Sequence, residues 1–259
     1  MEAAGRSVKT AVISGGAGGL GRALSTGLQR RGWRVVLLDL DISGLERTPT
    51  QIPLPCDLTD AGQLAERVSE ILGLCEAIDL VIYNAGITQI GPFEAADEAG
   101  HRRVFEINYF SAVALARAFL QPIRAARGTH LAISSVAGFA PLYHRTAYAA
   151  SKHALEGFFK SLRSEERAHG VRTLIAAPAF VSTNPGDGGP QADGTARPGS
   201  AGDDVDPMTP EAAAEAILRG MEKSRPMIPV GRVAKAAWLI NRLSPGLYQR
   251  LMERRIDGA

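Results

Sequence analysis

Tyr148 and Lys152 are the two side chains whose types and spacing point most directly to chemistry in this sequence. Both lie in a segment, 147–168, with the apolar spacing of an amphipathic helix, where residues four apart share one face. A tyrosine phenol has an ordinary pKa of about 10, and a neighbouring ammonium lowers that pKa by favouring the phenolate. The pair is therefore a candidate acid–base device. Because the same spacing is common on ordinary helices, the rest of the chain must support it.

A glycine-rich turn near the start of the chain is the second chemical signal. A short apolar run at 10–14 leads into Ser14-Gly15-x-x-x-Gly19-x-Gly21, and helical spacing follows at 22–31. Glycines there let the main chain approach a pyrophosphate, whose negative charge the helix N-terminus favours. A second apolar run ends on Asp39, where a carboxylate can bind a ribose diol and repel a 2′-phosphate. The pattern predicts a dinucleotide site, with NAD(H) favoured over NADP(H).

These candidates need elements that position them, and the chain alternates short apolar runs with amphipathic segments. The alternation predicts one α/β domain over 1–259, of Rossmann type, with a doubly wound parallel sheet of about seven strands and helices on both faces. The segment 98–126 is expected to be helical and interrupted only at Pro122. Strands are expected at 10–14, 34–39, 52–56, 78–83, 129–135, 171–176 and 227–230, and helices at 22–31, 60–74, 98–126, 147–168 and 209–223.

Several short motifs occur in one order along these elements, and together they resemble the short-chain dehydrogenase/reductases. The motifs are Ser14-Gly15-x-x-x-Gly19-Leu20-Gly21, Cys56-Asp57-Leu58, Tyr83-Asn84-Ala85-Gly86, Asn108, Ser135 and Tyr148-x-x-x-Lys152. The resemblance runs from Lys9 to about Thr183. Tyr83 stands where the family often has a second Asn, and Ala179 replaces a family glycine. The resemblance implies an oxidoreductase that transfers a hydride between a nicotinamide and a carbinol or carbonyl carbon.

The resemblance also implies roles for individual residues. Tyr148 would exchange the substrate proton, Lys152 would activate it and bind the ribose, and Ser135 would stabilise the substrate oxygen. Asn108 would hold a water in the proton relay. Ser134 is expected to face the other side of its strand. The implied cofactor-binding residues are Ser14, Gly15, Gly19, Leu20, Gly21, Asp39, Asp57, Leu58, Asn84, Ala85, Gly86, Tyr148, Lys152, Pro178, Val181 and Thr183.

Composition narrows the class of protein. The formal net charge is +2, from 29 basic and 27 acidic residues, so a nucleic-acid partner is not expected. Cys56 and Cys75 are too few for a disulfide framework and have no metal-ligand spacing, so no metal site is predicted. No run reaches the roughly 20 apolar residues of a membrane span. These features predict a soluble, cytoplasmic protein.

Two segments of the chain stand apart from the α/β pattern. Glycine, proline and aspartate dominate 182–210, which we expect to form a mobile lid over the site rather than an inter-domain linker or a dispensable insertion. The basic amphipathic extension, 231–259, has six basic and two acidic residues, a net charge of +4, and Pro245 is expected to divide it into two helices. We favour its packing over the substrate cleft, with contact to an anionic membrane surface or docking on a partner as the alternatives.

The substrate and the assembly are predicted only by class. The expected lining is mostly apolar and favours a hydrophobic secondary alcohol or ketone as the small-molecule substrate. A homodimer or homotetramer is expected through 98–126 and 147–168. Alternatives are a non-catalytic dinucleotide sensor on the same fold, a nucleotide-sugar epimerase or dehydratase, and a methyltransferase, which would leave the Tyr-Lys pair unexplained. The residues expected to line the substrate site are Ala137, Gly138, Phe139, Leu142, Tyr143, His144 and Phe180.

Overall fold

A seven-stranded parallel sheet forms the centre of the protein. The computed structural model describes residues 8–183, 193–199 and 207–256. The strand order is β3-β2-β1-β4-β6-β7-β9, so the chain winds outward in one direction from β1 and then crosses to the other side at β4. The predicted doubly wound Rossmann-type sheet is confirmed. The strands are β1 (Thr10–Ser14), β2 (Arg34–Asp39), β3 (Gln51–Pro55), β4 (Leu80–Tyr83), β6 (Thr129–Ile133), β7 (Arg172–Pro178) and β9 (Met227–Val230).

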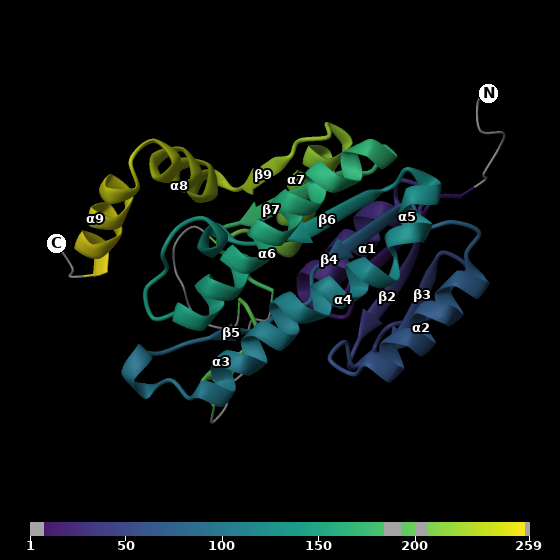
Figure 1. The fold of residues 1–259 in the computed structure, drawn as a ribbon, viewed down its shortest axis with the longest axis horizontal. Coiled ribbons are helices and arrows are strands. Elements are labelled where there is room, and N and C mark those ends of the chain that lie inside the picture. Colours follow the sequence, from purple (N-terminus) through teal and green to yellow (C-terminus); the bar gives the residue numbers. More distant parts are fainter. Residues whose placement is uncertain (1–7, 184–192, 200–206, 257–259) are drawn as a thin grey trace.

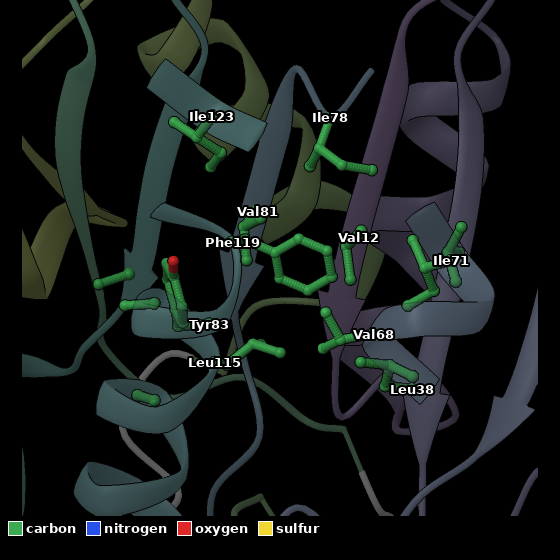
Figure 2. Packing of buried hydrophobic residues seen from close by; sticks show 14 of the residues in the cluster. Val12, Leu38, Val68, Ile71, Ile78, Val81, Tyr83, Leu115, Phe119 and Ile123 are labelled. Carbon is green, nitrogen blue, oxygen red and sulfur yellow. The ribbon is translucent and has the colours of Figure 1, made fainter. Parts of the chain in front are cut away.

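Helices cover both faces of the sheet because successive strand residues point to opposite sides. Ala11 and Ile13 of β1 pack beneath α1 (Gly19–Gln29) and α7 (Pro210–Glu222). Val12 packs on the opposite face, beneath α2 (Ala61–Leu74), α4 (Ser111–Ala118) and α6 (Thr146–Glu166). Figure 1 shows the two helical layers, and Figure 2 shows Val12 in the second core, close to Phe119 and Ile71.

A hydrogen-bonded pair of polar side chains lies inside that second core. The Tyr83 hydroxyl at the end of β4 is 2.6 Å from Nδ1 of His130 on β6, and the Phe159 ring packs against Tyr83. Both polar residues are buried. Burial raises the pKa of Tyr83 well above its ordinary value and lowers the pKa of His130 to about 4. Tyr83 therefore belongs to the core and does not face the glycine turn.

The helical stretch expected at 98–126 differs from the prediction. It divides into α3 (Glu98–Phe105), a π-helical turn (Glu106–Phe110), α4 and α5 (Leu120–Ala126). The break lies at Phe119, whose ring is fully buried and whose backbone leaves the helical region at φ −95° and ψ 7°. Pro122 sits inside the first turn of α5, where an N–H has no intrahelical partner. The expected interruption at Pro122 is therefore wrong.

The proposed lid segment, 182–210, contains a strand that the sequence did not predict. β8 (Thr195–Ala196) pairs antiparallel with β5 (Thr88–Gln89), which follows β4. Arg103 of α3 also forms an ion pair with Asp193, at 3.0 Å. The described part of the segment is thus held against β5 and α3, while 184–192 and 200–206 lie outside the described residues.

The C-terminal extension forms two helices that meet at Pro245, as predicted. They are α8 (Arg232–Leu243) and α9 (Pro245–Ile256), and both lie at one end of the molecule (Figure 1). Ala234 and Ala237 of α8 are buried against Val136 and Ala140, just beyond β6. One face of α8 therefore packs on the loop that follows Ser135. Within the described part of the chain, no helix combines the length and apolar character needed to cross a membrane.

Candidate active site

The glycine turn and the Asn84 segment form one hydrogen-bonded unit at the carboxyl ends of β1 and β4. Ser14 Oγ accepts hydrogen bonds from the main-chain N–H of Asn84 (3.0 Å) and Ala85 (3.2 Å). The Asn84 amide donates to the Gly15 carbonyl at 2.8 Å. Because β1 and β4 are the neighbours at which the chain reverses its winding, this unit lies where open α/β sheets bind ligands.

Two glycines make close main-chain contacts that a larger residue would prevent. A Cβ on Gly21 would lie 2.2 Å from the Gly15 carbonyl oxygen, and one on Gly19 would lie 2.4 Å from the Thr183 carbonyl oxygen. Gly18, the residue preceding α1, offers no side-chain cap to the first-turn amides. The turn thus presents main-chain N–H groups and a helix N-terminus, which fit a pyrophosphate. Leu20 contributes only its main chain here, because its side chain is buried in the core beneath α1.

Asp39 lies directly against the glycine turn. Its Oδ2 accepts a hydrogen bond from the Ala17 N–H, and its Oδ1 accepts one from the Leu40 N–H, both at 2.8 Å. The neighbouring Arg22 donates to the carbonyls of Ala17 (2.7 Å) and Gly44 (2.8 Å). The carboxylate is therefore fixed at the end of β2, where the ribose of a dinucleotide on this turn would lie.

Asp57 and Leu58 follow β3, beside the end of β2. The N–H of Cys56 donates to the Asp39 carbonyl at 2.8 Å, which places the two strand ends together. The Asp57 carboxylate accepts from the N–H (2.9 Å) and hydroxyl (2.7 Å) of Thr59, and Leu58 packs against the core. The Asp57 carboxylate thus stabilises its own turn, which lies at the edge of the predicted cofactor site.

Ser135, Tyr148 and Lys152 come together at the carboxyl end of β6. The Ser135 side chain lies close enough to the Tyr148 hydroxyl to lower the pKa of Tyr148, and Lys152 Nζ lies 5.7 Å from the centre of the Tyr148 ring. Desolvation raises the pKa of Tyr148, while the nearby Ser135 side chain and the Arg145 charge oppose this rise. Desolvation lowers the pKa of Lys152 to about 8, and the Glu156 charge opposes that change. Lys152 donates to the Ile133 carbonyl at 2.9 Å, which holds its ammonium beside the strand end.

Asn108 is brought to the same place by the π-helical turn. Its Oδ1 accepts from the Ile87 N–H at 2.8 Å, and its Nδ2 donates to the Ile87 carbonyl and to Ser151 Oγ, both at 2.9 Å. A Cβ on Gly86 would lie 3.2 Å from Asn108 Oδ1 and 3.5 Å from Lys152 Nζ. Gly86 therefore separates the cofactor turn from the catalytic candidates by only the thickness of the main chain.

Glu156 is a neighbour of the site that the sequence analysis missed. It is 1% exposed, one helical turn beyond Lys152, and Ser134 donates to its Oε1 at 2.9 Å. Lys160 donates to its Oε2 at 2.6 Å. Ser134 thus contacts Glu156 while Ser135 lies beside Tyr148, so the two adjacent serines have different partners on α6. The i, i+4 spacing of Lys152 and Glu156 was the available signal for this carboxylate.

The segment after β7 closes the site from the other side. Pro178 ends β7, Val181 packs against the core beneath α1, and Thr183 lies beside Gly19. Ala179 fits without strain, because the non-glycine residues with positive φ in the described chain are Arg127, His144 and Ser224. A glycine is therefore not needed at this position.

The expected substrate lining divides into buried and exposed parts. Ala137 and Gly138 are buried behind Ser135, and Phe139 packs against the α8 contact. Tyr143 is exposed and stacks on His144, with ring centres 3.7 Å apart. Leu142 and Phe180 are partly exposed. In the described parts of the chain, no cluster of His, Cys, Asp and Glu side chains could hold a metal ion.

This fold and this site define an α/β oxidoreductase with a dinucleotide-type glycine turn and a Ser-Tyr-Lys centre. Comparison with known proteins agrees. The model of the short chain dehydrogenase family matches residues 9–188. The chain therefore belongs to the short-chain dehydrogenase/reductase family, whose members act on CH–OH groups.

Two curated relatives and two solved structures show the extent of the similarity. Dehydrogenase/reductase SDR family member 7B of Bos taurus is 34% identical, over 94% of this chain and 80% of its own. Dehydrogenase/reductase SDR family protein 7-like of Anopheles gambiae is 30% identical, over 96% and 83%. A Burkholderia cenocepacia short chain dehydrogenase in complex with NADP has a TM-score of 0.83 at 23% identity, over 95% of this chain and 97% of its own. A Burkholderia phymatum short chain dehydrogenase/reductase in complex with NAD has a TM-score of 0.74 at 21% identity, over 85% and 88%.

Proposed function

We propose that this protein interconverts a hydrophobic secondary alcohol and its ketone with a nicotinamide cofactor, and that Tyr148 exchanges the proton. The observation that carries the proposal is the Tyr148 hydroxyl, which lies beside the Ser135 side chain and the buried Lys152 ammonium. These three groups lie across Gly86 from a glycine turn that fits a pyrophosphate. A sensor that only binds a dinucleotide has no need of this arrangement.

The chain's own residues supply positioning and proton transfer. When bound, a nicotinamide supplies or accepts the hydride. In the direction of reduction, charge develops on the substrate oxygen, and the Ser135 and Tyr148 hydroxyls donate hydrogen bonds to it. Tyr148 then gives its proton to that oxygen, and the Lys152 ammonium stabilises the phenolate left behind. Asn108 keeps the Ile87 main chain and Ser151 in place beside this centre.

Substitution of Tyr148 by phenylalanine tests this assignment. The variant removes the hydroxyl and keeps the ring, so we expect NADH binding close to that of the parent and turnover reduced by about 10²-fold or more. NADH fluorescence titration and single-turnover kinetics with a panel of secondary alcohols measure the two effects. Parent-like kcat in Tyr148→Phe would overturn the role of Tyr148. A parent protein that binds NADH but reduces no NAD with any alcohol would favour the sensor alternative.

Asp39 supports a preference for NAD(H). Its carboxylate is held against the glycine turn by the Ala17 N–H, where it can bind a ribose diol and repel a 2′-phosphate. The Arg22 guanidinium beside it donates to the main-chain carbonyls of Ala17 and Gly44. The preference is measured as the ratio of kcat/KM with NADH to that with NADPH.

The apolar lining supports a hydrophobic substrate. Ala137, Gly138 and Phe139 follow Ser135, and Phe180 follows β7, so the segments next to the catalytic candidates are mostly apolar, with the buried Arg145 as the cation that acts on Tyr148. An aliphatic or aromatic secondary alcohol fits this lining better than a charged hydroxy acid. Activity confined to small charged hydroxy acids in a substrate screen would refute this part of the proposal.

A homodimer is the assembly we propose. Phe110 is half exposed at the start of α4, and its ring contacts Tyr109, which in turn contacts Phe158 of α6. Exposed aromatic clusters of this kind favour association. Sedimentation velocity of the parent and of Phe110→Glu measures the assembly directly.

A further inference from the structure

The outward faces of α8 and α9 carry leucines that no other part of the described chain covers. On α8, Leu239 and Leu243 are 53% and 77% exposed, and on α9 Leu247 and Leu251 are 49% and 46% exposed. On α8 the opposite face is occupied, because Ala234 and Ala237 are buried in the small apolar cluster next to the Ser135 loop, which Tyr248 of α9 also contacts. We call the outward set, Leu239, Leu243, Leu247 and Leu251, the leucine face.

Cations flank the leucine face on both helices. At 100° per residue, Arg232, Lys235 and Arg242 fall on the same side of α8 as its two leucines, and Arg250 and Arg254 fall on the same side of α9. All five are exposed, and no carboxylate of the described residues forms an ion pair with them. The Arg242 guanidinium lies 5.3 Å from the centre of the Trp238 ring.

The combination of exposed leucines and cations favours one kind of binding partner over the others. Two copies of the chain that met through this face would bring five cations of each copy together, which disfavours self-association. A nucleic acid would use the cations but would leave the leucines in water. A bilayer with anionic headgroups satisfies both, because the leucines enter the acyl boundary while the cations stay among the phosphates.

We propose that the leucine face docks the protein on the surface of an anionic membrane, without spanning it. The contact would hold α8, and the Ser135 loop on which α8 packs, close to the lipid. If the substrate is hydrophobic, which rests on the proposed function, it would reach the site from the membrane. The docking itself does not depend on catalysis.

Vesicle binding by the full-length protein tests the proposal. We expect co-flotation with vesicles of phosphatidylcholine mixed with phosphatidylserine, little co-flotation with phosphatidylcholine alone, and weaker binding at high salt. The double variant Leu239→Gln, Leu243→Gln should reduce binding about tenfold or more, because two apolar side chains no longer enter the lipid.

A matched control uses exposed leucines elsewhere. Leu40 and Leu72 are 73% and 43% exposed near β2 and on α2, at the other end of the molecule from α9 (Figure 1). Leu40→Gln, Leu72→Gln should bind vesicles like the parent, and circular dichroism and NADH titration should show every variant folded. A third variant, Arg232→Gln, Lys235→Gln, should weaken binding to anionic vesicles. No binding by the folded parent, equal binding to both vesicle types, or dimers that Leu239→Gln, Leu243→Gln converts to monomers would overturn the proposal. The Tyr148→Phe variant should still dock, so docking and the proposed catalysis can fail separately.

Discussion

Replacement of His130 by glutamine should reduce the free energy of unfolding that the protein loses in mild acid. His130 is fully buried in the core beneath α6, with Nδ1 against the Tyr83 hydroxyl. Desolvation lowers its pKa to about 4, while the Glu166 charge raises it and the Arg124 charge lowers it. The unfolded chain takes up the proton near the ordinary pKa of about 6.5.

The difference between the folded and the unfolded pKa of His130 determines how the free energy of unfolding changes with pH. Because the folded pKa lies below the unfolded one, the neutral ring contributes its full stability above about pH 6.5 and loses it as the pH falls towards 4. The separation of about 2.5 pH units corresponds to about 3 kcal/mol in total. Between pH 7 and pH 5, where most carboxylates remain ionised, the loss is about 2 kcal/mol. Glutamine does not titrate, yet its amide oxygen can still accept the Tyr83 hydrogen bond.

Urea unfolding at pH 7 and pH 5 measures the effect. His130→Gln should be less stable than the parent at pH 7, because the ring packing is lost, but should lose about 2 kcal/mol less on acidification. His153→Gln is the matched control, since His153 is exposed on α6. It should lose as much free energy as the parent. Equal losses in the parent and in His130→Gln would refute the reasoning.

Two further substitutions address the site. Asp39→Ser removes the carboxylate beside the ribose position, so kcat/KM with NADPH should rise about tenfold or more relative to that with NADH; an unchanged ratio would show that Asp39 does not select the cofactor. Glu156→Gln keeps the acceptor for Ser134 but removes the charge that raises the pKa of Lys152. Because Lys152 is needed as the ammonium, activity is lost as the pH rises through its pKa of about 8. The alkaline limb of the kcat/KM profile should therefore move to lower pH in Glu156→Gln by about half a pH unit. At a fixed pH on that limb, this corresponds to a loss of about threefold in kcat/KM. The exposed Glu165→Gln on the same helix should leave the limb in place, and a Glu156→Gln profile identical to the parent's would exclude this electrostatic role.

The sequence predicted those parts of the molecule in which a local pattern determines the structure. β1, β2 and β9 begin and end at the predicted residues, because short apolar runs between turn signals leave few alternatives. Ser135, Tyr148, Lys152 and Asn108 meet as the family resemblance implied.

Features that depend on tertiary contacts were not predictable in this way. The helix break at Phe119 arises because that ring fills the core, which no helix propensity reveals. The pairing of β5 with β8 joins two-residue strands about a hundred residues apart, too short for any periodic signal. The sequence pattern does not distinguish Glu156 from a surface charge on an amphipathic helix, because its burial depends on contacts with Ser134 and Lys160.

Because of the π-helical turn, the position of Asn108 in the site depends on the number of residues before Ser111 as well as on their types. An α-helix rotates by 100° per residue, and a π turn accommodates one residue more than an α turn does. Loss of any single residue from 106–110 would let α3 and α4 join as one regular helix. Because an α turn holds one residue fewer, α3 and α4 would keep their relative orientation, and the side chains within the turn itself would point in new directions. Asn108 could no longer meet Ile87 and Ser151 while α3 keeps its contacts with α6. An insertion or deletion at this point is therefore more damaging to the site than most substitutions, although none of these residues except Asn108 lies in it.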